Sequence, residues 1–117
     1  MSEPVVYGDP ISTYVRSVRL ALAEKGVQHS LVAVDLVKGQ HKEAAHMARN
    51  PWGRMPAFEH AGQRFYEVSA IVRYVDEAFA GPALMPSMPA ERVRVNQVMS
   101  IVDSYGYAAS ITNIFIP

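Results

Sequence analysis

The periodicity of the apolar residues changes within the first 34 residues, and this change restricts the possible folds most strongly. Residues 4–7 form a short β-branched run closed by Gly8, Asp9 and Pro10, which indicates a strand. Residues 12–25 then space their apolar side chains as a helix does, and residues 31–34 form a second short apolar run. Strands joined by such a helix pair in parallel through a right-handed crossover. The chain is therefore predicted to begin with a βαβ unit.

The helix predicted over residues 12–25 has one apolar and one charged face. The apolar face consists of Val15, Val18, Ala21 and Leu22. The charged residues expected outside it are Arg16, Arg19, Glu24 and Lys25. Ser12 or Thr13 can cap the first turn, and Gly26 suits the left-handed residue that follows a helix.

The rest of the chain predicts a second supersecondary unit and one appended helix. After a short helix over residues 43–49, the runs 57–59 and 64–66 indicate a hairpin, and residues 68–79 an amphipathic helix. The inward positions of that helix are Ile71, Val72, Val75 and Phe79. We therefore predict an α/β domain over 1–80 with βαβ–ββα order, a proline-rich linker over 81–89, and a helix from 90 onward with a weak point at Gly106.

Composition excludes several kinds of chemistry. The chain has no cysteine, so disulfides, thiolate metal sites and cysteine nucleophiles are excluded. Its 11 basic and 11 acidic residues give a formal net charge of zero, which predicts no nucleic-acid or membrane partner. The spacing of His41 and His46 does not suit a helical metal pair. The start of the chain lacks the pattern of a secretory signal, so we expect a cytoplasmic protein.

The segment NPWGRMPAF, residues 50–58, places Pro56 directly before a predicted strand. Proline cannot donate a hydrogen bond to a strand ladder, so two geometries are open. A trans Pro56 can simply start the strand. A cis Met55–Pro56 bond instead turns the Met55 main chain outward, where it can pair with an extended peptide ligand.

Three features together resemble one known family. The βαβ–ββα order, NPWGRMPAF and YEVSAIVRYVDEAF (residues 66–79) are similar to the N-terminal, thioredoxin-like domain of the glutathione transferase superfamily. The serine-type phi, theta and zeta classes are the nearest. The resemblance covers essentially the whole chain, because residues 90–117 match the first helix of the family's all-helical second domain. It implies a cis Pro56 and a second domain that is truncated here.

The resemblance directs attention to the first turn of the helix that begins near residue 12. Glutathione transferases hold the thiol of glutathione as a thiolate, and a hydroxyl at a helix N-terminus favours that anion. Ser12 has this position, and its spacing to Arg16 is similar to that of the serine-type classes. Ser12 could instead serve only as the helix cap, in which case two roles compete for one side chain. Tyr7 is the alternative donor, and Thr13 and Tyr14 rank below Ser12.

The resemblance also implies contacts to the rest of glutathione. The basic pair His41 and Lys42 would meet the glycine carboxylate, although alone it is an ordinary solvated pair. Met55, held by Pro56, would pair its main chain with the cysteinyl portion. Glu67 would hold the γ-glutamyl ammonium, although a first-turn acid is common in helices.

Two positions depart from the family pattern. Arg54 stands where Gln is usual, and Val68 stands where a Ser is usual. Val68 keeps its main-chain N–H at the helix start but lacks the hydroxyl donor for the γ-glutamyl carboxylate. Arg54 could compensate with its charge. We therefore expect glutathione binding to be retained but weakened.

The predicted function is that of a homodimeric glutathione transferase whose thiolate attacks an apolar, electrophilic small molecule, with no cofactor beyond glutathione itself. Part of the electrophile site would come from the helix after residue 90. The alternatives are a glutathione-dependent isomerase or peroxidase, and a non-catalytic interaction module. The apolar end formed by Ile111, Ile114, Phe115 and Ile116 before Pro117 indicates a truncated or incomplete chain.

Overall fold

The computed structural model describes residues 2–115. The chain divides into two compact units, Met1–Leu84 and Met85–Pro117. The boundary between them falls inside the segment 81–89, which the sequence predicts to be a linker. The first unit holds the sheet, and the second consists of helical turns.

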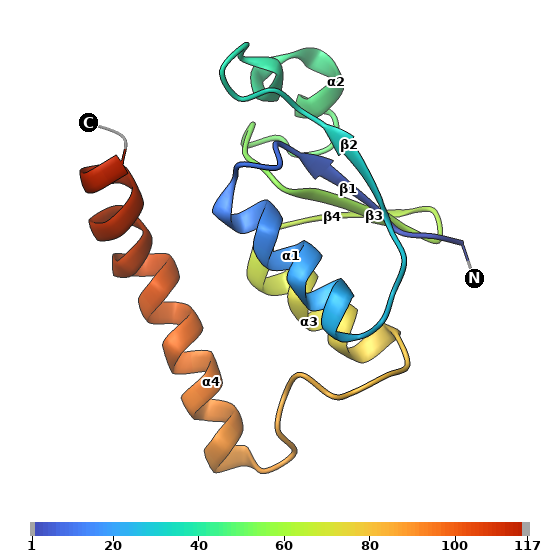
Figure 1. The fold of residues 1–117 in the computed structure, drawn as a ribbon, viewed down its shortest axis with the longest axis vertical. Helices are drawn as coiled ribbons and strands as arrows, with labels where there is room; N and C mark the ends of the chain where they lie inside the picture. The colour runs from blue at the N-terminus through green and yellow to red at the C-terminus, as the bar shows by residue number, and fades with distance from the viewer. Residues whose placement is uncertain (1, 116–117) are drawn as a thin grey trace. The chain divides into compact units, whose positions relative to one another are not determined.

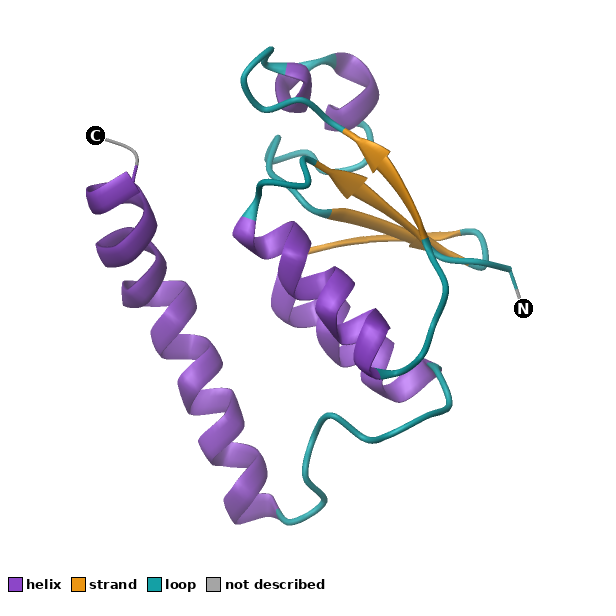
Figure 2. Cartoon of the chain, viewed as in Figure 1, coloured by secondary structure: helices purple, strands orange, loops and turns teal. Residues whose placement is uncertain are grey.

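The sheet of the first unit has four strands in the order β2-β1-β3-β4 (Figure 2). Their bounds are β1 Val5–Gly8, β2 Ser30–Ala33, β3 Ala57–His60 and β4 Gln63–Tyr66. β1 pairs with β2 in parallel, whereas β3 runs antiparallel to both β1 and β4. The predicted βαβ unit and hairpin are therefore both confirmed, and the thioredoxin-like order of the elements with them.

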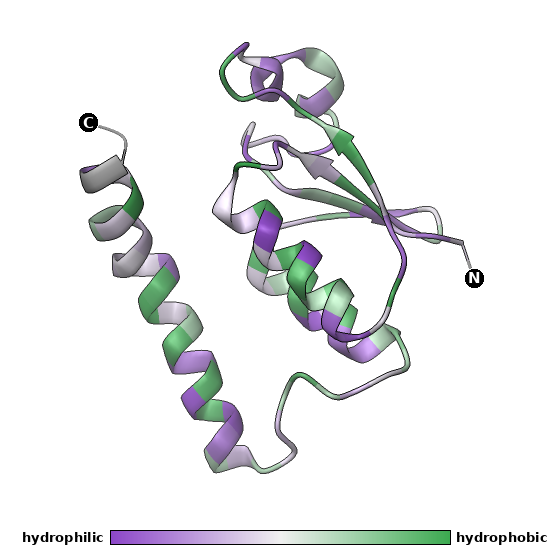
Figure 3. Ribbon diagram, in the orientation of Figure 1, coloured by the Kyte–Doolittle hydropathy of each residue, from purple (hydrophilic) through white to green (hydrophobic). Residues whose placement is uncertain are grey.

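Two helices cover one face of this sheet. These are α1, Thr13–Glu24, and α3, Val68–Ala78, which lie side by side in Figure 1. Figure 3 shows hydrophobic and hydrophilic positions alternating around α1, as the sequence predicts for an amphipathic helix. The fully buried side chains between the helices and the sheet are Val6, Val15, Val18, Leu22, Phe58, Ile71 and Val75. Burial of each of these apolar side chains contributes about 1.5–3 kcal/mol.

The segment between β2 and β3 contains only short helical turns. They are the 3₁₀ turn η1, Gln40–Lys42, and the helix α2, Ala44–Met47, whose N-cap is Glu43. The helix predicted over 43–49 is therefore confirmed in place but is shorter. His46 is its one buried residue, at 1% exposure. This large buried side chain helps to anchor the segment to the domain, together with buried Asn50.

The position of Lys25 contradicts the sequence prediction. Lys25 is buried at 6% exposure, and its Nζ lies 3.3 Å from Oδ1 of Asp76 and 2.9 Å from the Asp76 carbonyl oxygen. Helical periodicity explains the error, because residue 25 follows Ala21 and Leu22 by one turn and so shares their inward face. The prediction put Lys25 on the exposed face because its side chain is charged. In the fold, Asp76 of α3 provides a buried partner for that charge.

The second unit begins with α4, Pro89–Ile101, in which no residue is buried. The helix predicted from residue 90 onward is confirmed over the described residues, which are helical from 89 to 115, but π-helical turns follow α4: η2, Val102–Gly106, and η3, Ala108–Phe115. Gly106 ends η2, and glycine lowers helix propensity by about 1 kcal/mol. Among the described residues, no helix combines the length and apolarity needed to cross a bilayer. Ile116 and Pro117, and the side chains of Ile114 and Phe115, lie outside the described residues.

Candidate active site

The strand directions bring several predicted site residues to one edge of the sheet. The parallel strands β1 and β2 end there at Gly8 and Ala33, which are register partners. The antiparallel β3 begins there at Ala57, which pairs with both Tyr7 and Tyr66. Consequently Ser12 after β1, Met55 before β3 and Glu67 after β4 all lie beside strand ends at the same edge of the sheet. Both α1 and α3 begin at this edge, so the positive ends of two helix dipoles meet there.

Gly8 allows the first turn of α1 to lie directly against Met55. A Cβ at Gly8 would overlap Cγ2 of Val15 and would lie 3.5 Å from Cβ of Met55. The next residue makes the same connection, because the Asp9 N–H donates to Sδ of Met55 at 3.2 Å. The β1–α1 turn and the segment before β3 therefore form one continuous surface.

We expect Gly8→Ala to lower the free energy of unfolding and to disturb the contact between the first turn of α1 and Met55. Val15 is fully buried and β-branched, so it cannot turn aside without disturbing the core. Overpacking of this kind lowers the free energy of unfolding by about 1–3 kcal/mol. Chemical denaturation measures that change, and Gly106→Ala is the control, because a Cβ at Gly106 would lie no closer than 3.7 Å to its neighbours and Gly106 has no positive φ. A Gly8→Ala protein as stable as wild type would contradict the close approach.

Ser12, one of the two predicted caps, is the N-cap of α1. Its Oγ accepts a hydrogen bond from the Val15 N–H at 3.3 Å, and its backbone is extended. Capping uses a lone pair of the hydroxyl, whereas holding a thiolate uses the hydroxyl proton. The two roles therefore do not compete, contrary to the expectation from sequence. Within residues 2–115 no group accepts that proton.

Tyr7, the alternative donor, lies on the opposite face of the sheet from α1. Side chains alternate along a strand, and its neighbour Val6 is buried under the helices. The Tyr7 hydroxyl donates to Oε2 of Glu59 at 3.4 Å, and the Arg49 guanidinium lies 4.1 Å from the ring centroid. This geometry favours Ser12 over Tyr7 as the donor at the strand ends.

Asp9, which the sequence indicates only as part of a turn, also lies beside these strand ends. It is 8% exposed, and its Oδ1 accepts from the Ile11 N–H while its Oδ2 accepts from the Leu36 N–H, each at 3.0 Å. Its carboxylate thus joins the turn before α1 to the segment after β2. Aspartate before proline at a strand end was the available signal. Arg16 supports the same turn, because its Nε donates to the Pro10 carbonyl at 3.0 Å.

The Met55–Pro56 peptide bond is cis, which confirms the second of the two predicted geometries. Pro56 is buried, Met55 is half-buried and the Arg54 side chain is exposed. No turn or loop hydrogen bond of the described residues uses the main-chain N–H or C=O of Met55. Met55 thus keeps a donor and an acceptor for another extended chain.

His41 and Lys42 lie in η1, on the segment that leaves β2. The Nδ1 of His41 is buried without a partner among the described residues. Lys42 crosses the turn before Met55, because a Cβ at Gly53 would lie 2.9 Å from its Nζ. Gly53 has φ +63, a conformation that also favours glycine. The basic pair therefore lies beside the segment that leads to Met55.

Glu67 is the N-cap of α3 and has a strained backbone, with φ 76 and ψ 114. Its side chain is exposed and does not cap the helix. A positive φ in a non-glycine residue costs about 1–3 kcal/mol and is concentrated at functional sites. Val68 follows it, half-buried and packed against the core. Within residues 2–115, no group of His, Cys, Asp or Glu is arranged to hold a metal ion.

The sequence profile of the N-terminal domain of glutathione S-transferases matches residues 6–83. The chain belongs to the glutathione transferase family. It is 38% identical to the maleylacetoacetate isomerase of Pseudomonas aeruginosa over an alignment of 98 residues, which covers 77% of this chain and 46% of that protein. It is 41% identical to glutathione S-transferase F6 of Arabidopsis thaliana over 75 residues, covering 64% of this chain and 36% of that one. The chain thus spans less than half the length of these two relatives.

Solved structures of glutathione transferases have the same fold. Glutathione transferase F7 from Populus trichocarpa is 33% identical, with a TM-score of 0.75 over 91% of this chain and 51% of that one. A bacterial maleyl pyruvate isomerase of the zeta class is 30% identical, with a TM-score of 0.83 over 96% of this chain and 52% of that one. The phi and zeta classes suggested by the motifs are therefore both represented among the similar proteins.

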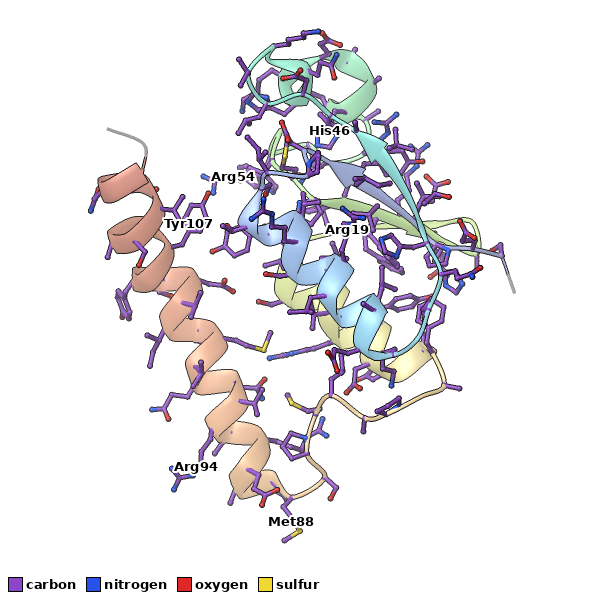
Figure 4. The ribbon with its side chains drawn as sticks, viewed as in Figure 1. Arg19, His46, Arg54, Met88, Arg94 and Tyr107 are labelled. Carbon is purple, nitrogen blue, oxygen red and sulfur yellow. The ribbon has the colours of Figure 1, made fainter. Side chains whose placement is uncertain are left out.

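The two positions that depart from the family pattern, Arg54 and Val68, adjoin Met55 and Glu67 beside the same strand ends. Arg54 precedes Met55, and its exposed guanidinium makes no hydrogen bond or ion pair to the described residues. Figure 4 shows Arg54 at the end of the domain where α1 begins. Val68 contributes an apolar side chain to the core at the first turn of α3. Compared with the family pattern, Arg54 therefore adds a positive charge before β3, and Val68 removes a hydroxyl after β4.

Proposed function

We propose that the protein carrying this chain is a glutathione transferase that binds glutathione along Met55 and ionises its thiol beside Ser12. The observation that carries the proposal is the Ser12 hydroxyl, whose oxygen caps α1 while its proton remains available. A hydroxyl donor and a helix N-terminus both favour a thiolate over a thiol. The thiolate then attacks an electrophilic carbon of an apolar small molecule.

Met55 binds the cysteinyl portion of glutathione as one strand binds another. Its free N–H and C=O can exchange hydrogen bonds with an extended peptide, and such main-chain pairing orients the ligand without regard to its side chain. The surface shared by Asp9 and Met55 then brings the cysteinyl sulfur toward the first turn of α1. Positioning of this kind is how the protein accelerates the attack, because no covalent intermediate with the chain is needed.

Charged groups around Met55 match the two ends of glutathione. His41 and Lys42 bind the glycine carboxylate, since both side chains belong to the segment beside the Met55 turn and both can donate hydrogen bonds. Glu67 holds the γ-glutamyl ammonium, and its strained backbone keeps its side chain out of the helix cap. The Val68 N–H at the start of α3 and the Arg54 guanidinium bind the γ-glutamyl carboxylate in place of the missing serine.

A glutathione-dependent isomerase is the second candidate. Two of the similar proteins are a maleylacetoacetate isomerase and a maleyl pyruvate isomerase. The same thiolate would then add to an unsaturated carbon of the substrate and leave again after bond rotation, so glutathione would be regenerated. Glutathione consumption distinguishes the two reactions. By analogy with its family, we propose a cytoplasmic homodimer for either activity.

Titration calorimetry with glutathione tests the proposal. We expect saturable binding with one site per chain, and weaker binding of a glutathione analogue that lacks the glycine residue, because His41 and Lys42 lose their partner. Turnover with an activated aryl chloride and with a cis-unsaturated diacid then separates transferase from isomerase. Absence of measurable glutathione binding would instead support a non-catalytic interaction module.

A further inference from the structure

The carbonyl oxygen of Arg54 accepts two hydrogen bonds from side chains on the preceding segment. Nε2 of His46 lies 2.7 Å from it, and Nδ2 of Asn50 lies 3.0 Å from it. Because a carbonyl can only accept, His46 carries its proton on Nε2 in this pair. His46 is 1% exposed and Asn50 is 3% exposed, so both bonds are shielded from water. Figure 4 labels His46 and Arg54 at this end of the domain.

This carbonyl determines the direction of the neighbouring donor. The Arg54 C=O and the Met55 N–H belong to one planar peptide unit, and in a trans unit the two bonds point in opposite directions. Turning the carbonyl inward toward His46 and Asn50 therefore turns the Met55 N–H outward. With both acceptor sites of the oxygen occupied, rotation of the peptide plane would break two buried hydrogen bonds.

His46 and Asn50 are themselves held firmly. The His46 carbonyl accepts from the N–H groups of Arg49 and Asn50, each at 2.9 Å, which closes the chain after α2. Oδ1 of Asn50 accepts from the Trp52 N–H at 3.0 Å, so its amide nitrogen is directed at Arg54. The donors thus come from a closed turn, and their positions do not depend on a ligand.

We propose that His46 and Asn50 are positioning residues that aim the Met55 N–H at the cysteinyl carbonyl of glutathione. The inference rests on the proposed function, because it concerns the same ligand. Neither side chain touches glutathione. Their effect is to remove the reorientation of the Arg54–Met55 peptide that binding would otherwise require, which is the advantage of a preorganised site.

The test compares glutathione affinity in matched variants. His46→Leu introduces an apolar side chain of similar size and removes the donor, and we expect its Kd for glutathione to rise about 10-fold. His46→Gln carries an amide donor in place of the ring N–H and should stay within about 3-fold of wild type. Asn50→Asp keeps the acceptor for Trp52 but loses the donor to Arg54, so its Kd should also rise. Turnover at saturating glutathione should change less than about 2-fold, because Ser12 is not disturbed.

His60→Leu is the matched control. His60 is also buried, at 3% exposure, and its Nδ1 lies 2.6 Å from the Tyr74 hydroxyl, but it sits at the far end of β3 from Met55. Its loss should lower stability without changing the Kd for glutathione. An unchanged Kd in folded His46→Leu and Asn50→Asp would overturn the positioning role while leaving the proposed function intact.

A measurement on the unaltered protein keeps the inference testable if the variants fail to fold. In amide nitrogen–proton spectra, the Met55 resonance should shift strongly when glutathione is added, and the His46 Nε2 proton should exchange slowly with water. A Met55 amide that does not respond to bound glutathione would overturn the inference. Failure of wild type to bind glutathione at all would overturn the proposed function and this inference together.

Discussion

Ser12→Ala should lower turnover about 10²- to 10³-fold while changing the Kd for glutathione less than about 3-fold. The hydroxyl proton of Ser12 stabilises the thiolate, whereas the peptide portion of glutathione is held by Met55 and the charged residues. Without that donor, the pKa of the bound thiol rises toward that of free glutathione. Less thiolate is then present at neutral pH, and the rate falls with it. Steady-state kinetics and the pH dependence of thiolate absorbance measure both effects.

Two further variants separate catalysis from helix capping. Ser12→Thr keeps a hydroxyl and should retain most activity, whereas Ser12→Asp keeps the cap acceptor but offers the thiolate no proton and a repelling charge. Loss of the cap in Ser12→Ala should lower stability by about 1 kcal/mol, which Ser12→Asp should largely restore. If Ser12→Ala retained full turnover, Ser12 would be only a cap and Thr13 would become the next hydroxyl to test.

Asp76→Ala should lower the free energy of unfolding by about 3 kcal/mol, which corresponds to a fall in Tm of about 10–20 °C. The side chains of Lys25 and Asp76 are 3% and 14% exposed. Oδ1 of Asp76 accepts from both the Lys25 ammonium and the Leu84 N–H, the latter at 2.7 Å. Removing it leaves a buried cation with the Asp76 carbonyl as its acceptor. Thermal and denaturant unfolding followed by circular dichroism measure the loss.

The double variant Lys25→Met with Asp76→Leu is the control for this ion pair. It removes both charges together, and replacing a buried pair by apolar side chains is often neutral or stabilising. The double variant should therefore be more stable than Asp76→Ala. The pair joins the last turns of α1 and α3, at the opposite ends of both helices from Ser12 and Glu67. Glutathione affinity of the folded variants should consequently match wild type, and a single variant as stable as wild type would contradict the role assigned to the pair.

Local patterns predicted the elements of the first domain well, because each strand or helix has its own periodicity. Val15, Val18 and Leu22 are buried where the helical spacing puts them. Lys25 was placed wrongly because residue type took precedence over position on the helix. The helix expected after residue 90 is present over the described residues, but its apolar pattern gave no sign that the hydrogen-bond spacing changes after Ile101.

The amino-acid sequence by itself determined the βαβ–ββα order, the start of the first helix at Ser12 or Thr13 and the family to which the chain belongs, because these depend on neighbouring residues and on linear motifs. The tertiary structure decided which residues meet. Strand directions bring Ser12, Met55 and Glu67 to one edge, and strand alternation turns Tyr7 away from it. Asp9, His46 and Asn50 acquire their roles through hydrogen bonds to main-chain groups of other segments. Main-chain groups are the same in every residue except proline, so only the folded geometry shows which of them a side chain will bind.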